Sequence, residues 1–235
     1  MRIRRSVGPI LALAITAMTA AVLAPTAIDD NFNDNSLDTD LWRVRHEGGV
    51  TLRERHQRLD ARADGATGFL SFHYLELRDW GINWKRNFNA SIKYKIDIPA
   101  PPSDRFAAIQ FGLAFTEPNP LANGVSIAVI RADDGWWLAW FLIEDGDIID
   151  FARKRLSQVS GTLEISWNKS LDRLSISAAG KTLYLDDLYL DFGGEFGTAP
   201  VIVRFGVGVD GGDMEFSGSQ VNIDDFQFDG HTRPR

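Results

Sequence analysis

The 235-residue chain contains no cysteine. Disulfide bonds, thiolate metal sites and a cysteine nucleophile are therefore excluded. The sequence also lacks a Gly-x-Ser-x-Gly elbow and a phosphate-binding glycine loop, so it has no motif for the common nucleophilic or nucleotide chemistries. Histidine is scarce as well, and the four residues show no metal-ligand spacing. These are His46, His56, His73 and His231.

A concentrated basic face is also missing. The formal net charge is −7, and lysine and arginine are scattered along the chain. Phosphate binding needs clustered positive charge, so nucleic acid is a poor candidate partner. The one locally basic stretch contains five arginines, and we interpret it as an exposed strand pair that balances nearby acids. Its arginines are Arg43, Arg45, Arg53, Arg55 and Arg58.

Only one long hydrophobic run is present, and it lies at the start of the chain. Arg2, Arg4 and Arg5 precede an apolar stretch over Ile10–Leu23, and small residues follow up to Ala27. This order predicts a secretory signal peptide over residues 1–27, since the run is short for a membrane span. The alternative is an N-terminal anchor that is retained. Cleavage removes three arginines and no acidic residue, which takes the net charge from −7 to −10.

After this segment, hydrophobic residues recur at every second position. The clearest runs are 91–98, 109–115 and 201–209, with shorter ones at 163–167 and 174–176. A two-residue period marks strands with one buried face, and helical periodicity is almost absent. Asp145-Gly146 and Ala179-Gly180 predict hairpin turns. We therefore expect one all-β domain over residues 28–230, an antiparallel two-sheet jelly-roll sandwich, and a flexible tail over 231–235.

The last predicted strand changes phase. Val221 and Ile223 share one parity, whereas Phe226 and Phe228 share the other, with Asp224 and Asp225 between them. A β-bulge would restore the inward direction of the hydrophobic side chains, because it inserts one extra residue. A strand buried on both faces is the alternative.

Two terminal segments resemble the concanavalin A-like lectin/glucanase superfamily. Residues 29–42 read DDNFNDNSLDTDLW, similar to the first strand of secreted members, and residues 221–228 read VNIDDFQF, similar to the terminal strand. Between them, Leu163–Leu185 resembles a hairpin of laminin-G-like and family-16 glycoside hydrolase sandwiches. The resemblance implies curved antiparallel sheets whose first and last strands are neighbours. It does not fix a function, because function lies in the site rather than the fold.

The resemblance directs attention to a catalytic motif that this sequence lacks. Family-16 hydrolases carry two carboxylates on one strand, as Glu-x-Asp-x-Glu or Glu-x-Asp-x-x-Glu. The nearest acids here surround the Asp-Gly turn, and Glu144 and Asp147 have opposite parity. We interpret them as solvated turn residues. A polysaccharide-degrading enzyme, acting by hydrolysis or lyase chemistry, stays open as an alternative function.

Aromatic residues give the main functional hypothesis. Indole faces stack on sugar rings, and the concave sheet of a jelly roll can display such a platform. Trp136 and Trp140 share one strand face and Trp137 the other, so one of these faces fills the core. We predict a glycan-stacking surface formed from tryptophans. The candidate residues are Trp80, Trp84, Trp136, Trp137 and Trp140.

A structural calcium ion is implied by the same resemblance. Family-16 members often hold Ca²⁺ with an acid of the last strand and oxygens near the first, positions that Asp225 and Asp30 occupy here. A charged pair that protects the sheet edge is the alternative. The sequence thus predicts a glycan-binding module, secreted, periplasmic or on the cell surface, with bacterial export fitting the absence of cysteine. A structural or adhesive domain without a small ligand is a further alternative.

Overall fold

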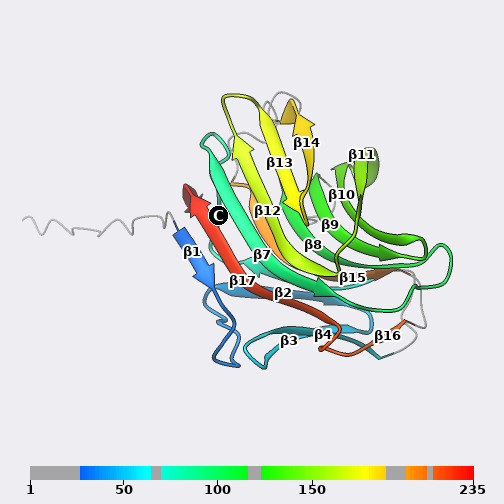
Figure 1. The fold of residues 1–235 in the computed structure, drawn as a ribbon. Helices are drawn as coiled ribbons and strands as arrows, with labels where there is room; N and C mark the ends of the chain where they lie inside the picture. Colours follow the sequence, from blue (N-terminus) through cyan, green and yellow to red (C-terminus); the bar gives the residue numbers. More distant parts are fainter. Residues whose placement is uncertain (1–26, 65–69, 116–122, 189–199, 211–213) are drawn as a thin grey trace, which may run out of the picture.

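The computed structural model describes residues 27–64, 70–115, 123–188, 200–210 and 214–235, which are nearly all β-strand (Figure 1). They form an all-β sandwich of two large antiparallel sheets, as predicted. The predicted signal peptide, except for Ala27, lies outside the described residues. Within the described ranges, no helix is long and apolar enough to cross a membrane.

The first sheet, sheet A, has nine strands. Its order is β14-β13-β12-β7-β17-β4-β16, with β1 also paired to β17 and β3 to β4. The first strand therefore lies against the last long strand, as the superfamily resemblance implies. The strands are β1 (Ala27–Asp30), β3 (Val50–Arg55), β4 (Arg58–Asp64), β7 (Phe88–Ile96), β12 (Ser160–Asn168), β13 (Arg173–Ala178), β14 (Lys181–Asp186), β16 (Glu215–Phe216) and β17 (Val221–Gly230).

The second sheet, sheet B, has seven strands in the order β11-β10-β9-β8-β15-β5-β2. They are β2 (Trp42–Glu47), β5 (Leu70–Leu77), β8 (Phe106–Ala114), β9 (Gly124–Ala132), β10 (Gly135–Glu144), β11 (Asp147–Leu156) and β15 (Ile202–Asp210). Strand β11 continues through the basic residues 153–155 near its end. Because β11 is an edge strand, Phe151 and Arg153 can extend the sheet surface beyond β10.

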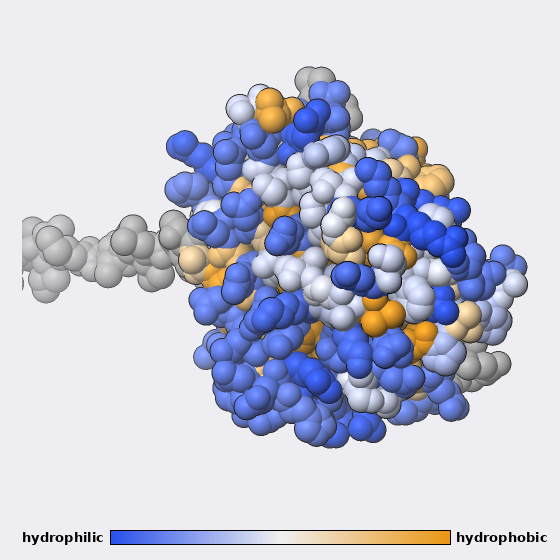
Figure 2. Space-filling model, in the orientation of Figure 1, coloured by the Kyte–Doolittle hydropathy of each residue, from blue (hydrophilic) through white to orange (hydrophobic). Residues whose placement is uncertain are grey.

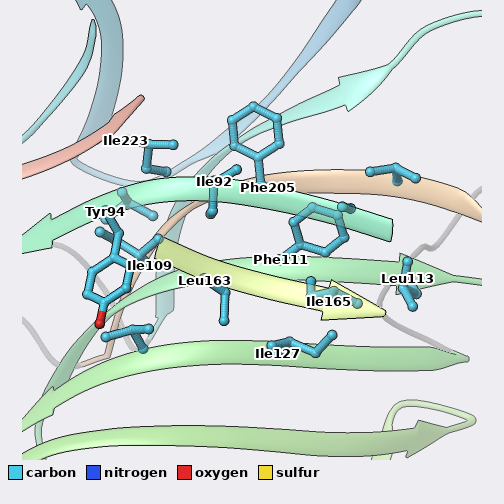
Figure 3. Packing of buried hydrophobic residues seen from close by; sticks show 14 of the residues in the cluster. Ile92, Tyr94, Ile109, Phe111, Leu113, Ile127, Leu163, Ile165, Phe205 and Ile223 are labelled. Atoms are coloured by element: carbon cyan, nitrogen blue, oxygen red, sulfur yellow. The ribbon is translucent and has the colours of Figure 1, made fainter. Parts of the chain in front are cut away.

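The core lies between the two sheets, and the predicted alternation supplies it. Figure 3 shows Ile92, Tyr94, Leu163 and Ile165 of sheet A facing Ile109, Phe111, Ile127 and Phe205 of sheet B. All are nearly inaccessible to solvent. Around Phe205, Trp42 packs edge-on at 5.1 Å and Phe226 stacks at 5.1 Å between ring centroids. Burial of this apolar surface is the main favourable contribution to folding.

The turn and bulge predictions are confirmed. Asp145 and Gly146 both have positive φ between β10 and β11, and Ala179 and Gly180 do so between β13 and β14. In β17 the pairing register shifts between Asp224 and Gln227, and Asp225 has φ of 44°. The bulge lets Val221 and Ile223 as well as Phe226 and Phe228 point into the core.

Residues 231–235, expected to be a flexible tail, instead take part in the fold. Thr232–Pro234 forms β18, which pairs with β6 (Trp80–Ile82) in a small third sheet. The Arg235 guanidinium then binds the carboxylate of Glu76 at 2.9 Å and the carbonyl oxygen of Leu77 at 2.6 Å. Backbone pairing and one buried ion pair fix this segment. Neither needs alternating hydrophobic residues, so the sequence pattern did not predict its order.

Candidate functional site

The outer face of sheet B has its side chains arranged in three rows that cross all seven strands. The rows follow from the strand registers, since paired residues of neighbouring strands point to the same side. From β11 to β2, the rows are Arg155, Trp137, Ile130, Ala108, Gly208, Phe72 and Glu47; Arg153, Ala139, Ala128, Gln110, Gly206, Tyr74 and Arg45; and Phe151, Phe141, Ser126, Gly112, Arg204, Glu76 and Arg43.

Aromatic side chains gather at the β10–β11 end of these rows. Phe141 and Phe151 are nearly parallel, with an interplanar angle of 20° and centroids 6.3 Å apart. Trp137 is half-buried, and its indole N–H donates to the Asp134 carboxylate at 2.8 Å. The guanidinium of Arg153 lies 4.4 Å from the Trp137 ring centroid. The hydrogen bond and the cation–π contact hold the indole in a fixed orientation.

Beside these aromatics the surface is hollowed. The hollow has a volume of about 470 Å³. It is lined by Asp104, Arg105, Phe106, Gln110, Ile130, Ala132, Asp133, Trp137, Ala139, Phe141, Phe151, Arg153 and Asp210. Burial raises the pKa of the Asp210 carboxyl, and the nearby Arg105 charge opposes that effect. Apolar walls with a few polar groups are the usual composition of a small-ligand site.

The middle of the rows consists mostly of small residues, with Ile130 and Gln110 as the larger ones. Ala108, Gly112, Ala128, Gly206 and Gly208 lie between the aromatic end and the β5–β2 end. At two of these positions atoms of neighbouring strands occupy the space that a β-carbon would need. A Cβ on Gly112 would lie 2.6 Å from Nε of Arg204, and one on Gly206 would lie 2.1 Å from the carbonyl oxygen of His73. Backbone atoms therefore require glycine at position 206, whereas a Cβ at position 112 would displace the Arg204 side chain.

The opposite end of the rows carries arginines around one buried carboxylate. Glu76 is 1% exposed, and its Oε1 lies 3.8 Å from Arg43, 3.7 Å from Arg45 and 2.9 Å from Arg235. With three cations on it, this carboxylate acts as the charge partner of the arginines. We call Arg43, Arg45, Arg204 and Arg235 around Glu76 the arginine cluster.

Tyr74 and Gln110 connect the arginine cluster to the hollow. The Tyr74 hydroxyl donates to the side-chain oxygen of Gln110, which itself lines the hollow. The Arg204 guanidinium lies 5.4 Å from the Tyr74 ring centroid. Burial raises the pKa of Tyr74 to about 12, so its hydroxyl stays protonated at neutral pH and serves as a hydrogen-bond donor.

The predicted tryptophans do not form one surface. Trp84 and Trp140 are 3% and 5% exposed in the core, and Trp84 stacks on Phe115 at 4.7 Å. Trp136 faces inward on β10, where its indole N–H donates to the carbonyl oxygen of Ile96. Trp80 lies apart, in β6 of the third sheet. Only Trp137 lies on the outer face of sheet B, because it has the parity opposite to the core-facing Leu138 and Trp140.

Several site residues were missed by the sequence analysis. Phe151 and Arg153 belong to a segment without clear periodicity, and strand pairing alone brings them beside Phe141 and Ala139. Arg204, Gly206 and Gly208 were hidden within the hydrophobic run 201–209. A usable signal was present there: after Ile202, the residues between Val203, Phe205 and the later valines are Arg204, Gly206 and Gly208, which is unusual for a solvated strand face.

The predicted calcium residues have partners of their own. Asp30 accepts hydrogen bonds from the indole N–H of Trp42 at 2.7 Å and the backbone N–H of Phe32 at 2.9 Å. Asp225 forms an ion pair with Lys93. An ammonium group and two N–H donors on these carboxylates do not fit a Ca²⁺ site, which needs several free oxygen ligands. No group of three or more metal-binding side chains occurs in the described part of the chain, and calcium stays an untested prediction.

Comparison with known proteins gives structural but no sequence relatives. No protein family and no curated protein matches the sequence. Among solved structures, the carbohydrate recognition domain of Emp47p is 14% identical, with a TM-score of 0.56, and the match covers 88% of this chain and 95% of that one. A lectin from Bauhinia forficata in complex with GalNAc is 14% identical, with a TM-score of 0.53 over 88% and 99% of the two chains.

A third similar structure is an enzyme. The Crh5 transglycosylase is 13% identical, with a TM-score of 0.59 over 88% of this chain and 85% of that one. At such low identity these matches establish the fold alone. The chain has the fold of the concanavalin A-like lectin/glucanase superfamily.

Proposed function

We propose that this protein is an exported carbohydrate-binding module, and that glycan binds in the hollow on the outer face of sheet B. The observation that carries the proposal is the aromatic wall formed by Trp137, Phe141 and Phe151 beside a floor of small residues. The N-terminal segment, with its arginines and apolar run, supports export.

Stacking on a sugar ring needs an exposed aromatic face held in one orientation. Trp137 is held in one orientation, since Asp134 accepts its N–H and the guanidinium groups of Arg153 and Arg155 lie 4.4 and 5.6 Å from its ring centroid; a sugar would stack on the part of the ring that they leave open. A rigid indole loses little conformational entropy when a ligand binds, and the neighbouring hydrogen-bonding groups can meet the hydroxyls of a sugar. Gln110, Asp133, Asp210 and Arg105 provide such groups in the hollow.

The similar structures support the proposal without deciding it. Two of those compared are described as a carbohydrate recognition domain and as a lectin in complex with GalNAc. The third is a transglycosylase. In this chain the buried carboxylate of the arginine cluster is held by three arginines, which favours binding over an acid–base reaction at that position.

The test is affinity electrophoresis of the protein through gels that contain individual polysaccharides, with Trp137→Ala as the variant. Tyr184→Ala is a matched control, because Tyr184 is 53% exposed on sheet A and also has an arginine, Arg173, over its ring at 5.1 Å. We expect retention by one class of glycan, weakened about tenfold or more in Trp137→Ala and unchanged in the control.

Equal loss in both aromatic variants would point to nonspecific adsorption and contradict the site. Failure of every polysaccharide to retain the wild-type protein would contradict the function itself.

A further inference from the structure

Positive charge is concentrated at one end of the outer face of sheet B, although the whole protein is acidic. Four arginines surround the single carboxylate of Glu76, three of them as ion pairs and Arg204 through longer-range attraction. Even with Glu47 of the first row at the same end, two negative charges cannot neutralise four positive ones. The chain as a whole has a net charge of −7, so this local excess is opposite in sign to the rest of the molecule.

Among the arginines of this cluster, Arg204 has the positive charge that acidic partners compensate least. Its side chain is 6% exposed, yet the guanidinium has no hydrogen bond and no carboxylate within ion-pair distance among the described residues. Its side chain lies over Gly112, and its guanidinium lies 5.4 Å from the Tyr74 ring centroid. Burial of a charge without a hydrogen-bonded partner is costly, so a partner from outside the chain would relieve that cost.

Arg45 also has an N–H donor without a hydrogen-bond partner. It is paired with Tyr74 across β2 and β5, which places it on the same face as Arg204. Its Nε is buried without a hydrogen-bond partner, while its terminal nitrogen lies 3.7 Å from Glu76. Guanidinium groups bind carboxylate and sulfate oxygens through paired N–H donors, which makes both residues suited to an anionic group.

The arginine cluster lies in line with the aromatic wall. Phe141, Ser126, Gly112 and Arg204 are successive members of one row across β10, β9, β8 and β15. Neighbouring strands are about 4.8 Å apart, so Phe141 and Arg204 are separated by about 14 Å. The floor between them is formed by small residues. An extended chain of sugars, rather than one ring, could therefore contact both ends.

We propose that the ligand is an acidic polysaccharide, one of whose carboxylate or sulfate groups binds Arg204 and Arg45 while another sugar stacks on Trp137. This inference rests on the proposed glycan-binding function and narrows its substrate class. An acidic protein repels an acidic polymer at long range, so retention has to come from a local cationic site.

The experiment uses three polymers: dextran as the neutral one, dextran sulfate with the same backbone, and polygalacturonate as the carboxylate form. Affinity is measured by electrophoresis and by calorimetry at two salt concentrations for the wild-type protein, Arg204→Gln and Arg45→Gln. Arg62→Gln is the matched control, because Arg62 is an exposed arginine on β4 of sheet A. The Arg45 variant keeps the test decisive if Arg204→Gln folds poorly.

We expect one acidic polymer to bind at least tenfold more tightly than dextran, with a tenfold or greater loss in each cluster variant and none in Arg62→Gln. The preferred acidic polymer identifies the anionic group as carboxylate or sulfate. The anion subsite would be overturned if the protein bound dextran as tightly as the acidic polymers and if Trp137→Ala, but neither arginine variant, lost this affinity. The proposed glycan-binding function would still stand. No binding to any glycan would overturn both.

Discussion

The two sheets have similar inner faces and very different outer faces. Towards the core, both present Ile, Leu, Val and Phe at every second residue. On the outside, sheet A carries short polar and charged residues, among them Asn89, Ser91, Lys93, Thr162, Glu164, Ser166, Ser175 and Ser177. The view in Figure 2, with β7, β12 and β17 towards the reader, is mostly hydrophilic or near neutral, with scattered hydrophobic residues.

Sheet B replaces those residues with aromatics, glycine, alanine and arginine. A solvated strand face has no need for glycine, which weakens a strand, nor for an arginine buried without a partner. The inner faces therefore explain why the chain folds, whereas the aromatic and arginine side chains on the outer face of sheet B are not needed to form the core. The two faces should respond to mutation in different ways.

The largest effect is expected from a phenylalanine of the inner face. Phe205→Ala removes a ring that packs between Trp42 and Phe226, so the free energy of unfolding should fall by about 3–5 kcal/mol. Phe151→Ala removes the same ring from the outer face, where it is 58% exposed, and should cost about 0.5 kcal/mol or less. Urea denaturation of both variants measures the contrast. Similar losses would show that the outer aromatics are structural.

The second prediction concerns a substitution that fills the hollow with a larger side chain. Ala139→Phe places a ring between Trp137 and Phe141, so glycan affinity should drop about tenfold or more while the far-ultraviolet circular dichroism is unchanged. Thr162→Phe, on the outer face of sheet A, is the matched control and should leave affinity unaltered. An Ala139→Phe protein that folds and binds normally would place the ligand elsewhere on the molecule.

The smallest effect concerns a histidine at the edge between the sheets. Burial, with His46 and Arg53 nearby, lowers the pKa of His73 from 6.5 to about 4. The folded protein thus binds a proton less readily than the unfolded chain. Stability is fully retained above pH 6.5 and should fall as the pH drops towards 4. Because the side chain is partly exposed, we expect a loss of about 1 kcal/mol, less than the full shift implies.

This pH effect is tested by urea denaturation of the wild-type protein and of His73→Gln, each at pH 7 and pH 4.5. Every other titrating group is the same in both proteins, so the difference between their pH profiles isolates His73. Parallel profiles would contradict the assigned burial effect.

Much of the fold could be predicted from local sequence. The runs around Ile92, Phe111 and Phe205 alternate because one face of each strand is buried, and such a period is visible without knowledge of the partner strand. The Asp145-Gly146 turn and the bulge at Asp225 are likewise encoded within a few residues. These features depend on local backbone geometry and on the direction of neighbouring side chains.

The site was harder to predict because it depends on register between distant segments. The position of Trp137 on the outer face of its strand follows from parity, but nothing local places Arg204 in the same row as Phe141. Trp84 was an equal candidate for stacking in the sequence, but the fold buries it against Phe115. The role of Arg235 depends on Glu76, which lies far from it in the sequence.

The place of β17 within sheet A has a consequence for how the chain folds. This strand, near the end of the sequence, lies between β7 and β4 and also pairs with β1 at the beginning. The two parts of sheet A on either side of β17 cannot pair until residues 221–230 have been synthesised. The contacts that complete the sheet therefore join distant parts of the domain. Chains dominated by such non-local contacts fold slowly. A newly made polypeptide would consequently remain unfolded for longer than one built from local hairpins alone.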